Sequence, residues 1–117
     1  MKEQKDILHI RVVKDAIEAI GRYTAGMDEP SFCANELVRD ATLMRLIVVG
    51  EYLGKVSDKT RLAYPEIDWS GWRRARDYYS HGYGGVDWPW VWETISADLP
   101  ALAPQIENLY GELEKEN

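Results

Sequence analysis

One short segment of this 117-residue chain concentrates the side chains that could do chemistry. It holds three arginines, an aspartate and a histidine, in the sequence Arg73-Arg74-Ala75-Arg76-Asp77-Tyr78-Tyr79-Ser80-His81. An imidazole can move protons near neutral pH, and a guanidinium can hold a phosphate and stabilise charge as it builds. RNA supplies its own nucleophile, the 2′-hydroxyl. These residue types point to phosphodiester cleavage in RNA by a route that requires no metal ion.

Helical spacing brings some of these side chains to one face. Asp77 and His81 are four residues apart and share a face. Arg76 and His81 are five apart, which is about 140° around an ideal helix. The latter two converge only if the helix ends near Ser80, or if a second subunit completes the site. Glycines at positions 82, 84 and 85 make an early helix end possible.

The same segment has a plain structural interpretation. An Arg-Arg-x-Arg sequence on an exposed helix is typical of a solvated surface, and a histidine near a helix C-terminus interacts favourably with the helix dipole.

Polar residues on the preceding helix are open to two interpretations as well. Glu51 with Arg45, and Arg39 with Asp40, either form surface ion pairs of small energetic weight or face the arginine-rich segment as supporting groups.

Composition narrows the class of protein. Hydrophobic residues make up 45% of the chain and charged residues 29%, which is typical of a globular protein. Two histidines and one cysteine, Cys33, are too few for a standard zinc site, so no metal or cofactor is expected. The lone cysteine fits a reducing cytoplasm. The net charge of −6 makes binding of nucleic acid through a global field unfavourable, so RNA contact requires a local basic patch.

Apolar residues recur at helical spacing along most of the chain, and no segment alternates with period two. This pattern predicts an all-α bundle of four to five helices in a single domain, residues 1–117. The expected helices cover residues 5–23, from Ser31 or Asn35 to 56, from 69 or 70 to 80, and from an Asp87 cap to 113. Pro100 and Pro104 predict a kink or a split near Asp98 in the last helix. Residues 57–70 are expected to form a loop with one short turn. Neither a signal peptide nor a membrane span is expected, because the longest apolar run covers only residues 46–49.

The helix that ends near residue 56 has two apolar stripes. One consists of Leu37, Ala41, Met44, Val48 and Tyr52, and the other of Leu43, Ile47, Gly50 and Leu53. A helix that is apolar on two sides is buried on two sides. Because a single small bundle covers only one side well, the other stripe is a candidate subunit interface.

Several motifs together resemble the HEPN ribonucleases, and in particular the HepT branch, the toxins of HepT–MntA toxin–antitoxin pairs. Residues 76–81 match the R-x4–6-H motif, and Tyr83 completes the H-x-Y extension of that branch. Three further stretches resemble its other signatures: Arg39-Asp40-Ala41 with Val49-Gly50-Glu51, then Pro65-Glu66-Ile67-Asp68-Trp69, and finally Val91-Trp92-Glu93-Thr94-Ile95 with Asp98-Leu99-Pro100. The chain departs from the family pattern at Asp77, where asparagine is common, and at Ser80, where an apolar residue is common. Asp77 would either hydrogen-bond His81 and raise its basicity or tether Arg76.

The resemblance implies a dimerising HEPN-type bundle that cuts RNA without a metal ion and acts as a toxin in the cytoplasm. Arg76 and His81 would be the catalytic residues, and the motifs of two subunits would form one composite site in the dimer cleft. Asp77 and Glu51 would support that site. DNA is not an expected substrate, and no membrane partner is expected.

The resemblance also suggests further contacts and a partner. Arg73 and Arg74 would contact the RNA backbone, although Arg74 also satisfies a six-residue spacing to His81. The expected partner is an MntA-like nucleotidyltransferase antitoxin, which would inactivate the toxin by adding AMP to Tyr83. The alternative function is that of a non-catalytic helical dimer that binds such a nucleotidyltransferase.

Overall fold

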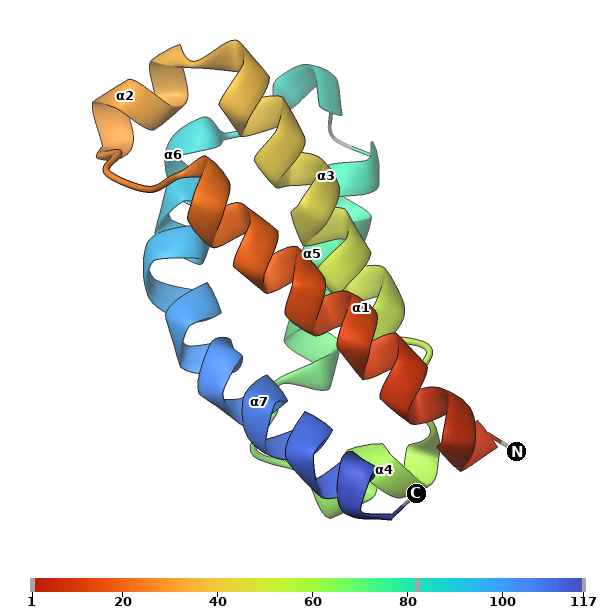
Figure 1. Cartoon of the computed structure of the whole chain (residues 1–117). Helices are drawn as coiled ribbons and strands as arrows, with labels where there is room; N and C mark the ends of the chain where they lie inside the picture. The colour runs from red at the N-terminus through yellow and green to blue at the C-terminus, as the bar shows by residue number, and fades with distance from the viewer. Residues whose placement is uncertain (1, 82, 117) are drawn as a thin grey trace.

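Helices account for nearly all of the chain in the computed structural model, which describes residues 2–81 and 83–116 and, for residues 2–4, 80, 81 and 83, only the backbone. The α-helices are α1 (Lys2–Tyr23), α2 (Glu29–Ala34), α3 (Glu36–Leu53), α4 (Asp58–Ala63), α5 (Trp69–His81), α6 (Trp88–Glu93) and α7 (Leu99–Lys115). A short 3-10 helix, η1 (Tyr83–Gly85), follows α5, and a π-helical segment, η2 (Thr94–Asp98), joins α6 to α7 (Figure 1). No strand occurs within these residues. The predicted all-α bundle is confirmed.

Helix α3 lies in the middle of the bundle, with α1 packed on one side and α5 on the other, and α1 packs in turn against α7 (Figure 1). Leu43, Gly50 and Leu53, from one of the two predicted apolar stripes, are buried. In the other stripe, the side chains of Leu37 and Met44 are 80% and 61% exposed, whereas Ala41, Val48 and Tyr52 are half-buried. The chain therefore covers one apolar side of α3 and leaves part of the other exposed.

Helices α2 and α3 each begin at a side-chain cap. Asn35 caps α3 by accepting a hydrogen bond from the backbone N–H of Val38 at 3.0 Å, as one of the two predicted starts requires. The other predicted start, Ser31, lies inside the separate short helix α2. There it completes a capping box with Asp28, and the two exchange side-chain-to-backbone hydrogen bonds of 3.0 Å.

Helix α4 occupies part of the stretch that was predicted to be a loop. Six residues are too few to show a helical period in the sequence. A buried carboxylate on α1 fixes its start: Asp6 accepts hydrogen bonds from the backbone N–H of Ser57 at 2.9 Å and from the hydroxyls of Ser57 and Thr60, both at 2.6 Å. Asp6 is fully buried, so these three bonds compensate for its loss of water.

A kink or a split was predicted near Asp98, and the structure has an irregularity there without a break, because α6, η2 and α7 follow one another directly. Proline has no backbone N–H to donate to the preceding turn, and the π-helical segment η2 ends at Asp98, two residues before Pro100. At the start of the same region, Asp87 caps α6 by accepting from the backbone N–H of Trp90 at 3.1 Å, as predicted. None of the described helices combines the length and hydrophobicity that crossing a membrane requires.

Candidate active site

A glycine controls how closely α3 and α5 approach each other beside Arg76. A Cβ atom on Gly50 would lie 2.4 Å from the Cβ of Arg76 and 2.6 Å from the carbonyl oxygen of Trp72. Such distances are shorter than any carbon–carbon or carbon–oxygen contact that a folded protein tolerates, so only glycine fits here. The glycine of the Val49-Gly50-Glu51 sequence thus allows the stem of Arg76 to lie directly on α3.

The next residue on α3 supplies a charge partner for the same arginine. Nη1 of Arg76 lies 3.3 Å from Oε2 of Glu51, and its Nε lies 2.9 Å from Oδ1 of the neighbouring Asp77. The arginine side chain is 29% exposed, and the two acidic side chains are 44% and 52% exposed. The structure therefore brings three predicted site residues together at a surface that ligands can reach.

Several N–H donors of the Arg76 guanidinium make no hydrogen bond to the described residues. A guanidinium has five N–H donors, and Arg76 makes one hydrogen bond, from Nη1 to Glu51, among the described residues. The short contact with Asp77 is an ion pair without hydrogen-bond geometry, and the Nε atom is buried. The remaining donors suit a phosphate oxygen.

The ion pair of Asp77 distinguishes the two roles that the sequence left open for this residue. Asp77 tethers Arg76, which is the second of those roles. The side chain of His81 lies outside the described part of the chain, so the first role is not tested. The carboxylates at 51 and 77 hold the guanidinium from two sides, which restricts its rotation near the surface.

Two aromatic residues on the face of α5 that carries the stem of Arg76 anchor the helix in the core, since positions 72, 76 and 79 are four and three residues apart. Trp72 and Tyr79 are buried there, and the hydroxyl of Tyr79 lies 3.2 Å from that of Thr94 in the π-helical segment. Burial raises the pKa of Tyr79, so its hydroxyl stays neutral at physiological pH. Helix α5 is thus fixed in the core on either side of Arg76, while Arg73 and Arg74 are exposed.

His81 and Tyr83 are described through the backbone only. Helix α5 ends at His81, one residue beyond the predicted end at Ser80, and His81 is its last helical residue. Residues 76 and 81 therefore stay about 140° apart around the helix axis. Tyr83 is the first residue of η1. The side chains of His81 and Tyr83, like all of Gly82, lie outside the described residues, and so do the predictions made for them.

The two arginines preceding Arg76 differ from it in their surroundings. Both Arg73 and Arg74 are exposed. Arg74 donates to the hydroxyl of Ser70 at 3.3 Å, whereas Arg73 lines a hollow at the start of α5. Neither pairs with a carboxylate among the described residues. Both remain accessible to a phosphate backbone.

The ion pairs suggested for α3 do not form as suggested. Glu51 pairs with Arg76 rather than with Arg45, whose Nε donates to the hydroxyl of Tyr23 at 3.3 Å. Arg39 donates to the carbonyl oxygen of Cys33 at 2.8 Å instead of pairing with Asp40. Of these polar residues on α3, Glu51 faces the candidate site and Arg39 and Arg45 hold neighbouring elements.

Among the described residues, no three His, Cys, Asp or Glu side chains cluster in a way that could hold a metal ion. Burial raises the pKa of the Cys33 thiol, which favours its neutral and unreactive form.

Sequence reasoning missed the residue that fixes where α5 begins. Asp68 precedes the helix and accepts a hydrogen bond from the backbone N–H of Gly71 at 3.0 Å, in the position of an N-cap. A Cβ on Gly71 would lie 2.1 Å from that carboxylate, so the glycine makes room for the cap. An aspartate three residues before a glycine, at the start of a predicted helix, is the signal that could have identified this cap.

Comparison with known proteins identifies the class to which this fold and site belong. The family described as "Ribonuclease HepT-like" matches residues 13–109, which is most of the chain. The chain therefore belongs to the HepT-like ribonuclease family, and its enzymatic class is that of a ribonuclease. No solved structure matches it.

Relatives from two archaea carry related names. "Putative RNase MJ0125" of Methanocaldococcus jannaschii is 31% identical over 99 residues, covering 85% of both chains. "Probable ribonuclease HepT" of Thermococcus cleftensis is 29% identical over 101 residues, which is 86% of this chain and 92% of the relative. "Gamma-glutamylcyclotransferase and putative RNase MJ0434" of M. jannaschii is 29% identical over 113 residues, or 96% of this chain. This chain spans about half of that last relative, 51% of its length.

Proposed function

We propose that this ribonuclease is an RNA endonuclease in which Arg76 and His81 carry the chemistry. The observation that supports this most strongly is the placement of Arg76, whose stem lies on Gly50 and whose partly exposed guanidinium pairs with two carboxylates. In this site the arginine binds the non-bridging oxygens of the scissile phosphate and stabilises the charge that builds there. Glu51 and Asp77 orient the arginine.

The proposed reaction uses the substrate's own nucleophile. The imidazole of His81 accepts the proton of the 2′-hydroxyl, and the 2′-oxygen attacks phosphorus. The bond from phosphorus to the 5′-oxygen breaks, and the leaving oxygen takes up a proton. The products are a 2′,3′-cyclic phosphate and a 5′-hydroxyl. No metal ion takes part, so cleavage should survive EDTA at the rate measured without it, and loss of activity restored by a divalent cation would contradict the proposal.

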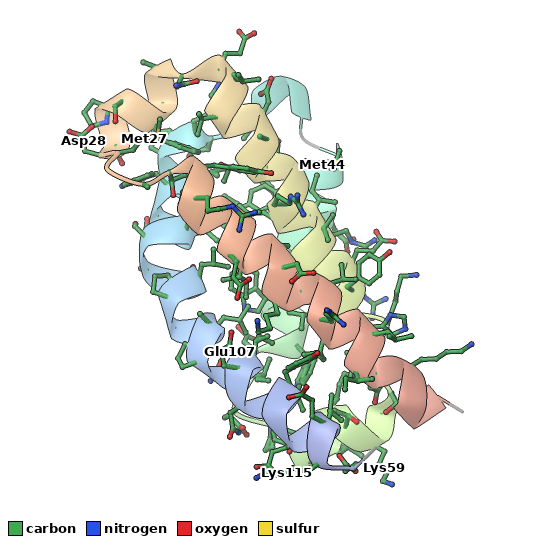
Figure 2. The ribbon with its side chains drawn as sticks, in the orientation of Figure 1. Met27, Asp28, Met44, Lys59, Glu107 and Lys115 are labelled. Carbon is green, nitrogen blue, oxygen red and sulfur yellow. The ribbon has the colours of Figure 1, made fainter. Side chains whose placement is uncertain are left out.

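We place the complete site at the interface of a homodimer. Two observations support this: α5 continues through residue 81, so one chain holds positions 76 and 81 far apart around the helix, and α3 has a partly exposed apolar stripe. Met44, in that stripe, lies on the side of α3 that faces away from α7 (Figure 2). Light scattering should give the mass of a dimer at micromolar concentration, and Met44→Asp should give a folded monomer without activity. A parent chain that is monomeric and active would contradict the composite site.

We further propose that the protein is the toxin of a cytoplasmic toxin–antitoxin pair with an MntA-like nucleotidyltransferase. The family supports this, and the position of Tyr83 two residues after the motif histidine gives the partner a target. Transfer of AMP from ATP to the phenol of Tyr83 releases pyrophosphate and leaves a phosphodiester near Arg76, where it competes with the RNA phosphate.

Intact-mass measurement after incubation with the partner and ATP tests this regulation. The parent chain should gain the mass of one AMP group and lose its activity. Tyr83→Phe should gain nothing and stay active. An equal mass gain on both chains would place the modification elsewhere. A chain that binds the partner but never cleaves RNA would favour the non-catalytic alternative.

A further inference from the structure

A concave feature lies beside the candidate site, at the start of α5. It is a hollow of about 390 Å³ between the end of α3, helix α4 and the first turn of α5. Leu62, Pro65 and Trp69 form its apolar walls, and Arg61 and Arg73 contribute its charged groups. Pro65 and Trp69 are the first and last residues of a stretch that resembles a family signature but has no role in the proposed cleavage mechanism.

The hollow and the candidate site share one seam between two helices. Gly54, the C-cap residue of α3, lines the hollow one helical turn beyond the Gly50 that contacts Arg76. Arg73 of α5 lies one turn before Arg76. One turn of α-helix is about 5.4 Å long, which is close to the separation of neighbouring nucleotides in an extended strand. A strand with one phosphate at Arg76 can therefore place the adjoining nucleotide in the hollow.

One wall of the hollow is a fixed aromatic ring. The indole N–H of Trp69 donates to the carbonyl oxygen of Tyr64 at 3.0 Å, and the ring is half-buried against the core. Leu62 stands at the rim with 81% of its surface exposed. A rigid aromatic face next to apolar side chains suits a planar base, because every base has a π-face that can stack.

The charges at the hollow favour an anion. Arg73 is exposed and makes no ion pair with any described residue, while Arg61 pairs with Asp58 within α4. The guanidinium of Arg73 therefore lies beside the aromatic wall and is available to an anion. It provides the local basic contact that RNA binding needs in an acidic protein.

We propose that this hollow binds an unpaired nucleotide of the RNA substrate next to the one at Arg76, with its base against Trp69 and its phosphate at Arg73. The proposal rests on the RNA cleavage site proposed above. It implies a preference for single-stranded RNA, because a base in a duplex is not available to enter a hollow.

The test uses single-stranded oligoribonucleotides that carry 2′-O-methyl groups throughout and so resist attack by their own 2′-oxygens. Binding to the full chain is measured for the intact strand and for strands with one abasic position moved stepwise along the sequence. For the parent protein, one abasic position should weaken binding about 10-fold, the scale of a base–aromatic stack. Trp69→Leu should weaken binding of the intact strand by a similar factor and abolish the effect of the abasic position.

Further variants keep the test decisive if Trp69→Leu folds poorly. Leu62→Glu places a carboxylate at the rim, where exposure makes the change harmless to folding, and it should weaken RNA binding about 10-fold. Arg73→Ala should weaken binding and lower its salt dependence, and its matched control is Arg22→Ala, an exposed arginine in the last turn of α1. Trp90→Leu removes a 40% exposed tryptophan from α6 and should leave the abasic scan unchanged.

The possible failures are distinguishable. A flat abasic scan with a parent chain that cleaves RNA overturns the nucleotide site and leaves the cleavage proposal intact. A position-dependent scan with a parent chain that never cleaves RNA overturns the cleavage proposal and leaves the nucleotide site. If Leu62→Glu and Trp69→Leu bind RNA like the parent but escape the nucleotidyltransferase, the hollow binds protein and the nucleotide site is wrong.

Discussion

Two arginines of this molecule, Arg39 and Arg76, lie at contacts between helices. They differ in the groups that hold the guanidinium. Arg39 on α3 donates to the carbonyl oxygen of Cys33 at 2.8 Å, and its guanidinium lies 4.8 Å from the ring centroid of Trp88. Those partners are backbone and packed aromatic surface, so they cannot leave without disturbing α2 or α6. Arg76 is held by two carboxylates that are about half exposed, 44% and 52%. These can shift or share the guanidinium when a phosphate arrives.

The comparison shows that the function of an arginine depends on whether its partners can release it. The region around Arg39 is a clamp that joins α2, α3 and α6, since cation–π and charge-assisted contacts stabilise packed elements. The region around Arg76 is the proposed site, and its exposed ion pairs contribute little to stability. Each of the following changes tests this difference.

Replacement of Arg76 should have the largest effect. Arg76→Ala removes the group that stabilises the developing charge, so cleavage of a labelled RNA should fall by at least about 100-fold. The free energy of unfolding, measured in urea, should change by less than about 1 kcal/mol. A large loss of stability with residual activity would make Arg76 a clamp like Arg39.

Gly50→Ala should disturb both stability and activity, because its Cβ would lie 2.4 Å from the Cβ of Arg76. We expect the free energy of unfolding to fall by about 1–3 kcal/mol and cleavage per folded molecule to fall as the arginine is displaced. The matched control is Gly111→Ala on α7, where an added Cβ meets nothing within 4 Å. That change should stabilise the helix by up to about 1 kcal/mol. Equal effects of the two substitutions would contradict the close crossing.

Arg39→Ala tests the region around Arg39, and it should lower stability rather than activity. Losing the carbonyl contact and the Trp88 contact should lower the free energy of unfolding by about 1–3 kcal/mol. Cleavage per folded molecule should stay within about two-fold of the parent, since an effect of that size is well under 1 kcal/mol. A drop in activity as large as that of Arg76→Ala would bring Arg39 into the site.

Glu51→Gln should have the smallest effect. It removes one of two carboxylates that orient Arg76, and an exposed ion pair of about 0.2–1 kcal/mol corresponds to a two- to five-fold loss in cleavage rate. Glu18→Gln is the control, because it breaks a similar exposed pair with Lys14 on α1, of 3.0 Å. Only the change at 51 should alter the rate, and identical rates for both variants would remove Glu51 from the site.

The long helices and the residue types of the site could be predicted from the sequence because both are local properties. The apolar period revealed α1, α3 and α7, and the residues from Arg76 to His81 resembled a ribonuclease motif. Helix α4 was not predicted because its position depends on Asp6, more than 50 residues earlier in the chain.

The pairings on α3 could not be predicted for a related reason. Arg39, Arg45 and Glu51 each had a nearby opposite charge or polar neighbour in the sequence, yet each binds a residue elsewhere. Glu51 reaches Arg76 across 25 positions because Gly50 lets two helices meet there, and no local pattern contains that distance. The crossing of α3 and α5 therefore decides whether Glu51 forms an ordinary surface ion pair or contacts the candidate site.

The central claim is that Arg76 and His81 cleave RNA through its own 2′-hydroxyl, and the chemistry of the product ends tests it most directly. A short RNA is cut by the parent chain in EDTA, and its ends are analysed by mass, alongside the same RNA with one 2′-deoxy nucleotide at the cut site and alongside the His81→Ala and Arg76→Ala variants. We predict a 2′,3′-cyclic phosphate and a 5′-hydroxyl from the parent, and no cut from the 2′-deoxy strand or from either variant. Cleavage of the 2′-deoxy strand at the same position, or cleavage by either variant at the parental rate, would contradict the account.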